Sequence, residues 1–245
     1  MKKLIPLALA AMTGAACTST QFTQAMQDAS AVMQGEGTAP ALTNADVIAG
    51  LKEALTKGAE HSVGLASATD GFWGSERLRI PFPPEAIKVK NTLNDLGMKA
   101  QVERFELTMN RAAETAAQEA VPVFVNAIKG MTVADGFAIL RGGEHAATNF
   151  LQERTTAELT TTFRPIVEQA TQQVALTSYW TPLAGTYNKA VLFTGGTAVD
   201  PDLDAYVTQQ AINGLFVLVA DEERKIRQDP MARTSDLLRR VFGAQ

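Results

Sequence analysis

The chain has 245 residues, of which 46% are hydrophobic, and its formal net charge at pH 7 is −4. This apolar content suffices for one sizeable core. The acidic balance argues against a nucleic-acid-binding surface, which needs clustered lysines and arginines, and the densest basic positions are only Arg77 with Arg79 and Arg239 with Arg240. We therefore expect no nucleic-acid partner.

The first sixteen residues have the layout of a bacterial export signal. Lys2 and Lys3 supply the positive start, residues 4–12 form an apolar run, and residues 14–16 are the small residues of a cleavage site. The run is too short to span a membrane, which takes about 20 apolar residues. We expect residues 1–16 to be a signal peptide and the rest of the chain to be exported, in the periplasm or anchored to a membrane and facing the periplasm.

Cys17, the single cysteine of the chain, follows this segment directly. In one interpretation a lipoprotein peptidase cuts before Cys17 and the thiol is acylated, which anchors the chain to a membrane. In the other, an ordinary signal peptidase cuts nearby; Gly14 fits this interpretation, because lipoprotein signals usually carry Leu or another aliphatic residue there. An unpaired cysteine in an exported chain calls for a special explanation, so lipid attachment at Cys17 is our prediction.

Residues 17–42 are rich in Ser, Thr, Gln, Ala and Gly, which is typical of a flexible tether, here with a marginal helix. Helical periodicity begins at Thr43, where Thr43 and Asp46 have the spacing of a capping box, and it fades after His61. Glycines and prolines then predict a long ordered loop over 67–84 with an extended piece at Arg79–Phe82.

Further helices are predicted along the rest of the chain. They cover 85–96 with Gly97 as C-cap, 101–129 with an alanine-rich face and a bend at Pro122, 132–141 behind a second capping box, and 144–178 with a kink or interruption at Pro165. Residues 179–200 read as a connector, in which Val191–Phe193 could pair with Arg79–Phe82 as a small two-stranded element.

The last predicted long helix starts at Asp200-Pro201 and runs to about Arg227. Its centre, "AINGLFVLVA", is apolar on all sides, so we expect it to be sunk into the core, with Gly214 allowing a close crossing against the alanine-rich face of 101–129. Glu223 and Arg227 have the spacing of a surface ion pair. With a short final helix over 235–242, residues 43–245 are predicted to form one all-α multi-helix bundle.

No local motif for catalysis is present in the sequence. The two histidines, His61 and His145, stand in different segments and do not have metal-ligand spacing. Serine-hydrolase, P-loop and dinucleotide-binding patterns are also lacking. We accordingly expect no metal, no cofactor and no catalytic residue that a motif would identify.

Four stretches, "MNRAAETA", "TVADGFAILRGGEHAATNFLQERT", "YVTQQAINGLF" and "IRQDPMARTSDLLRRVFG", resemble in this order the domain-of-unknown-function family 4197, a group of exported bacterial proteins. The resemblance covers almost all of 43–243 and implies a single helical domain behind a signal or lipoprotein peptide. It implies no activity, substrate or catalytic residue.

A set of polar residues is a candidate site. Glu106 and Asn110 fall inside or beside the apolar arc of the 101–129 helix, and the others are polar members of the quoted motifs. The set comprises Glu106, Asn110, Arg111, Glu114, Asp135, Arg154, Thr155, Arg227, Arg233, Thr234 and Asp236. These side chains either line a site or form ion pairs and bonds to loop backbone that hold helices together, and we favour the structural role.

Two hypotheses for function follow. The first is a non-enzymatic binding or structural module of the cell envelope, tethered to a membrane through Cys17 if that residue is acylated, which binds a partner protein or an apolar ligand. The second is a hydrolase or lyase of unfamiliar type that uses carboxylates in an interhelical cleft. An enzyme needs converging acids with shifted pKa values, whereas a binding module needs an apolar cavity or exposed patch.

Overall fold

The computed structural model describes residues 43–84, 87–173, 175–194, 198–200 and 202–228. The chain divides into two units, Met1–Ala41 and Leu42–Gln245, and all described residues belong to the second. The predicted signal peptide, Cys17, the tether, the 235–242 helix and the candidate residues Arg233, Thr234 and Asp236 lie outside the described residues.

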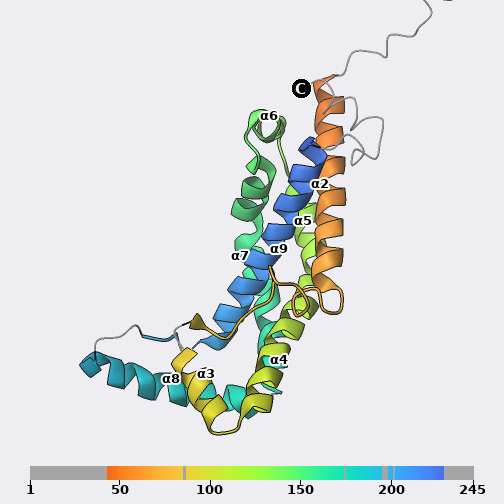
Figure 1. Ribbon diagram of the computed structural model, residues 1–245. Helices are drawn as coiled ribbons and strands as arrows, with labels where there is room; N and C mark the ends of the chain where they lie inside the picture. Colours follow the sequence, from red (N-terminus) through yellow and green to blue (C-terminus); the bar gives the residue numbers. More distant parts are fainter. Residues whose placement is uncertain (1–42, 85–86, 174, 195–197, 201, 229–245) are drawn as a thin grey trace, which may run out of the picture. The chain divides into compact units, whose positions relative to one another are not determined.

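The described part is all-α and contains no strand, which confirms the predicted fold class. Its helices, labelled in Figure 1, are α2 (Asn44–Ser67), α3 (Ile87–Asp95), α4 (Lys99–Ala117), α5 (Ala120–Lys129), α6 (Val133–Arg141), α7 (Ala146–Thr171), α8 (Ala175–Thr194) and α9 (Leu203–Gln228).

Helix α9 lies at the centre of the bundle, packed against α2, α4 and α7. Ala211, Ile212 and Leu215 are almost completely buried in this packing. The "AINGLFVLVA" stretch is not enclosed on every side, however, because Asn213 is exposed and Val217 is only partly buried. The central placement of this helix is therefore confirmed, while its burial covers one broad face.

Local capping chemistry sets several helix boundaries as predicted. Thr43 and Thr132 each accept a hydrogen bond from the backbone of an aspartate three residues later, and the aspartate side chain bonds the threonine backbone in return. Gly97 has φ +80°, a conformation that favours glycine, at the end of α3. Helix α2 continues past the predicted end at His61 to Ser67.

Pro122 acts differently from the prediction. The helix expected over 101–129 is divided into α4 and α5 rather than bent, and Pro122 lies in the first turn of α5, where its missing N–H needs no partner. The break falls at Gln118–Glu119, because the proline ring would clash with the carbonyl group of the preceding turn. Pro165 lies inside α7, which continues to Thr171 and ends before the predicted 178.

The predicted connector over 179–200 is wrong, because Ala175–Thr194 forms helix α8. Long-range contacts hold this helix: the Trp180 ring lies 5.7 Å from that of Phe82 between centroids, and the Asn188 side chain exchanges two hydrogen bonds with the backbone of Val199.

The two-stranded element between Arg79–Phe82 and Val191–Phe193 is wrong as well. Val191–Phe193 lies in the last turns of α8. The N–H and C=O of Ile80 both bond the side-chain amide of Asn110, at 2.8 and 2.9 Å, so this backbone has a partner without a second strand.

Gly214 does allow a close approach, but its neighbour differs from the prediction. A Cβ atom at Gly214 would lie 2.6 Å from Cε1 of Phe72, a fully buried residue of the loop after α2. The alanine-rich face of α4 is therefore not the surface that requires glycine here.

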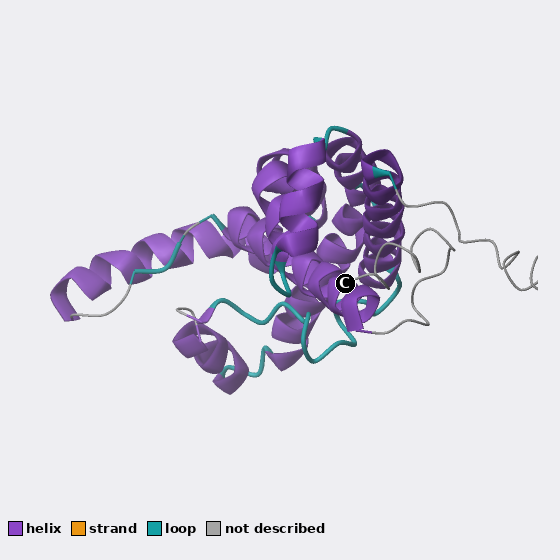
Figure 2. Cartoon of the chain, turned by 90° about the horizontal axis from the view of Figure 1, so that it is seen from above, coloured by secondary structure: helices purple, strands orange, loops and turns teal. Residues whose placement is uncertain are grey.

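The bundle has two distinct ends (Figure 1). The chain enters at the start of α2, near α6, while α3 and α8 lie at the opposite end, where α8 extends away from the other helices (Figure 2). No single described helix is long and apolar enough to cross a membrane; the segments Lys99–Lys129 and Val133–Arg141 meet that criterion only together, across a bend of 104°.

Candidate functional site

The candidate polar residues do not converge on one site. Those that the structure describes form two groups, each built around a buried carboxylate, and a few isolated positions. We call Asp70, Asn110, Arg111 and Glu114 the loop cluster, because they hold the 68–84 loop on α4, and Thr148, Glu223 and Arg227 the helix-end cluster, because they join α9 to the first turn of α7.

In the loop cluster, the Glu114 carboxylate is 4% exposed and accepts hydrogen bonds from two consecutive backbone N–H groups, those of Phe72 and Trp73, both at 3.1 Å. Arg111 neutralises this carboxylate through Nη1 at 2.6 Å and binds Asp70 through Nη2 at 2.7 Å. Asp70 has φ 65°, a left-handed conformation that aspartate tolerates better than most residues. The cluster therefore fixes a tight turn of the loop.

Glu106 and Asn110 are both buried, as the helical arrangement of 101–129 indicated. Asn110 holds the backbone of Ile80, and Glu106 pairs with Lys90 of α3 at 2.5 Å. Both residues join α4 to a neighbouring segment.

In the helix-end cluster, Glu223 supplies the cap that α7 lacks. His145, at the N-cap position of α7, makes no side-chain capping bond. Glu223 instead accepts the N–H of Ala147 at 3.0 Å and both the N–H and the hydroxyl of Thr148 at 2.8 Å. Four orphan N–H groups begin every helix, and a carboxylate there is also favoured by the helix dipole.

Arg227 completes this cluster. Its Nε and Nη2 donate to Oε1 of Glu223 at 2.9 and 2.8 Å, and Nη2 also donates to the carbonyl of Ile139 in α6 at 3.0 Å. The side chains of Arg227 and Glu223 are 18% and 5% exposed. The prediction of a surface pair is therefore wrong, because the buried Glu223 and the partly buried Arg227 link α6, α7 and α9.

The remaining candidates are separate from these clusters. Asp135 belongs to the capping box of α6, and the hydrogen bonds from Thr132 lower the pKa of its carboxyl below the usual value. Arg154 lies over the ring of Phe150, 5.6 Å from its centroid. The buried Thr155 hydroxyl donates to the carbonyl of Leu151 in its own helix.

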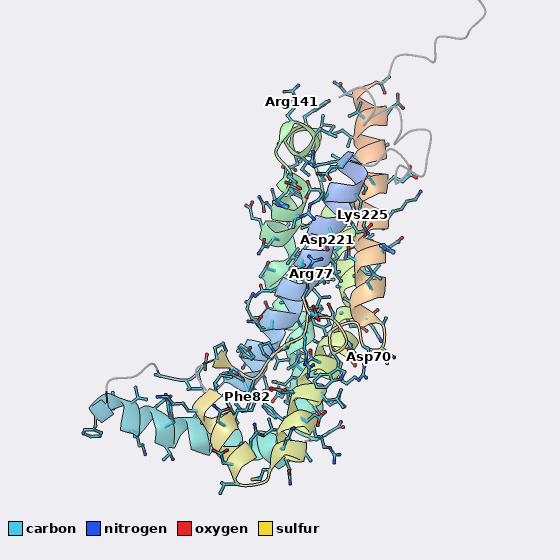
Figure 3. All side chains as sticks on the ribbon, in the orientation of Figure 1. Asp70, Arg77, Phe82, Arg141, Asp221 and Lys225 are labelled. Atoms are coloured by element: carbon cyan, nitrogen blue, oxygen red, sulfur yellow. The ribbon has the colours of Figure 1, made fainter. Side chains whose placement is uncertain are left out.

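An ionic network on the surface was not anticipated from the sequence. Arg77 of the 68–84 loop binds Asp221 of α9 through both terminal nitrogens (Figure 3). Arg224 bonds Asp221 and also Glu144. The hydrogen bond from Arg77 lowers the pKa of Asp221. Arg77 and Asp221 lie 144 residues apart in the sequence, so no local pattern indicates their contact.

Two hollows in the described part contain no assembled reactive centre. One of about 290 Å³ lies over α9 beside Leu65 and is lined by charges that already form ion pairs, including Arg77, Asp221 and Arg224. An apolar space next to Glu223 and Arg227 has only about 20 Å³. Within the described ranges, no three His, Cys, Asp or Glu side chains are grouped as metal ligands.

The geometry thus defines a class of protein: a helical domain whose buried acidic side chains hold its own backbone together. The chain belongs to the family described as protein of unknown function (DUF4197), which it matches over residues 41–243. Neither a curated protein nor a solved structure matches the chain.

Proposed function

We propose that this protein is a non-catalytic module of the cell envelope: an exported chain, anchored through an acylated Cys17, whose helical domain docks on another envelope component. The observation that carries the docking role is at the end of α8. Leu192 and Phe193 are adjacent, large and apolar, and their exposed fractions are 82% and 90%. Exposed apolar side chains that extend together from a domain mark interaction surfaces.

The carboxylates favour this role over a hydrolase or lyase. Glu114 and Glu223 are each engaged by backbone N–H groups and an arginine. The carboxyl pKa shifts found in the described residues, at Asp135, Asp202 and Asp221, are all downward. A general acid at neutral pH requires the opposite shift, because it must hold its proton until the reaction.

The cavities favour a docking surface over an internal apolar ligand. Pockets for small molecules typically have about 300–1,000 Å³ and apolar walls. The apolar space beside Glu223 has about 20 Å³, close to the size of a single water molecule. The larger hollow on α9 is lined mainly by paired charges. The exposed end of α8 is thus the better candidate for binding.

Export and anchoring are tested together in the native host. The intact mass of the purified protein should show a mature N-terminus at Cys17 carrying acyl chains. Cys17→Ser should move the protein from the membrane pellet to the soluble periplasmic fraction, because the anchor is lost. An unmodified N-terminus, or a Cys17→Ser protein that stays cytoplasmic, would contradict this part of the proposal.

Docking is tested by a photo-reactive amino acid placed at Phe193 in intact cells. Val133, at the start of α6, is 52% exposed and serves as the matched control at the other end of the bundle. We expect illumination to give adducts, to lipid or protein, from position 193 and few from position 133. Equal yields at the two positions would refute a specific docking role for α8.

A further inference from the structure

We propose that the surface formed by α3, the turn after it and the end of α8 docks on an anionic phospholipid surface. This inference rests on the proposed docking function and names its partner. The residues that would contact the lipid lie on two separate segments at this end of the bundle: Ile87, Leu96 and Lys99 from α3 to the start of α4, and Lys189, Leu192 and Phe193 in the last turns of α8.

The first observation is where exposed apolar side chains occur. Among the residues whose side chains the structure describes, six large hydrophobic ones are exposed, and four of them belong to this surface. Leu96 in the α3–α4 turn is 71% exposed and Ile87 is 40% exposed, in addition to the pair on α8. The other two, Leu65 and Val133, stand singly on α2 and α6, as occurs on any protein surface.

The second observation is charge. The segments 87–99 and 175–194 contain four lysines, at positions 88, 90, 99 and 189, and one carboxylate, Asp95, whereas the whole chain has 22 basic against 26 acidic residues. Lys90 is paired with Glu106 of α4, so the charge argument rests on Lys99 and Lys189. Helix α8 itself contains no acidic residue. Apolar side chains with lysines beside them, at one end of an otherwise acidic protein, complement a surface that is apolar inside and negative at its headgroups.

The shape of the surface favours lipid over a protein groove. Protein hot spots usually combine an anchor side chain with a well-packed pocket. Leu192 and Phe193 instead extend from a helix that itself extends from the bundle (Figure 2), a form that suits insertion into a fluid phase.

The length of the chain before the domain allows this contact even with an anchor at Cys17. The chain enters at Thr43, at the end opposite to α3 and α8. The 26 residues from Cys17 to Thr43 can reach at most about 90 Å. Helix α2, with 24 residues, is only about 36 Å long. Either end of the bundle can therefore face the membrane that holds the anchor.

The test uses the full chain with Cys17→Ser, which leaves no other cysteine and prevents acylation. An environment-sensitive fluorophore is attached to Phe193→Cys or, as control, to Val133→Cys. Vesicles contain phosphatidylglycerol and phosphatidylcholine, or phosphatidylcholine alone. Circular dichroism melts must first match those of the unlabelled parent, which is expected because both native side chains are largely exposed.

We expect a blue shift and quenching by nitroxide lipids at position 193 on the anionic vesicles, with position 133 unchanged. If the apolar run near the N-terminus alone bound the vesicles, the probes at 193 and 133 would respond alike, which would overturn the proposal. Lys99→Glu with Lys189→Glu should weaken the response at 193 about tenfold or more, since each lysine near an anionic surface contributes several-fold to binding.

The outcomes separate the two proposals. No response at 193 on any vesicle, together with protein adducts at 193 in cells, overturns the lipid surface and leaves the docking function intact. Failure of both experiments removes the docking function itself. An equal response on neutral and anionic vesicles refutes the role of the lysines and hence the anionic specificity.

Discussion

Replacing Glu223 with alanine tests whether one buried carboxylate holds the first turn of α7 on α9. The substitution leaves the N–H groups of Ala147 and Thr148 without this acceptor and removes the Glu223 carboxylate from the guanidinium of Arg227. A buried group that loses its only partner costs about 1–3 kcal/mol, and breaking a buried ion pair from one side costs about 3–5 kcal/mol.

These costs overlap, because Arg227 keeps its bond to the carbonyl of Ile139 and can turn toward water. We therefore expect Glu223→Ala to lower the free energy of unfolding by about 3–5 kcal/mol in total, a large part of the 5–15 kcal/mol that is typical of a domain. Glu223→Gln keeps one acceptor oxygen and should cost less.

The measurement is urea unfolding followed by circular dichroism. The control is Glu53→Ala, which removes the ion pair of Glu53 with Lys57. This pair has the same i,i+4 spacing, but the side chains of Glu53 and Lys57 are 34% and 48% exposed. It should change the free energy of unfolding by less than about 0.5 kcal/mol. Amide exchange at Ala147 and Thr148 should accelerate only in the Glu223 variant. If Glu223→Ala unfolds like Glu53→Ala, the capping role assigned to Glu223 is incorrect.

Gly214→Leu should destabilise by about 1–3 kcal/mol or more, because even a Cβ there would lie 2.6 Å from the Phe72 ring; a urea midpoint equal to that of the parent would mean that the ring yields freely. Gly64→Ala should stabilise the fold by up to about 1 kcal/mol, since Gly64 is exposed inside α2 and a Cβ there would have nothing within 4 Å. Gly71→Ala should destabilise it, because its Cβ would lie 2.6 Å from the carbonyl oxygen of Ala66. Thermal melts that rank the two variants in the opposite order would contradict both expectations. Arg77 lowers the pKa of Asp221 in the folded state below 3.8, so this ion pair stabilises the fold above about pH 5, and the stabilisation is lost as the pH falls through 3.8 toward the folded pKa. Between pH 6 and 2, the free energy of unfolding should therefore fall less in Asp221→Asn than in the parent. Equal decreases in the two proteins would rule out a contribution of the pair.

Features determined by neighbouring residues could be predicted from the sequence. The starts of α2 and α6 follow from threonine and aspartate three positions apart, and the end of α3 follows from Gly97. The burial of Asn110 followed from its angular position on the helix, because that position depends only on the helical repeat.

Features determined by distant contacts could not be predicted. Helix α8 contains a proline, a glycine and several threonines that favour a connector, and it is held by contacts of Trp180 with Phe82 and of Asn188 with Val199. Glu223 looks like half of a surface pair because its i,i+4 partner is visible in the sequence. The backbone groups that bury it lie 75 and 76 residues earlier.

The cap on α7 also bears on when the chain can fold. Helix α7 receives its N-terminal acceptor from Glu223, near the end of the last described helix, so its first turn stays uncapped until α9 has been synthesised and has docked. Closing a loop of this length is entropically costly and comes late in folding. In the export proposed for this chain, such a delay would keep the polypeptide competent for translocation until its C-terminal part has emerged on the far side.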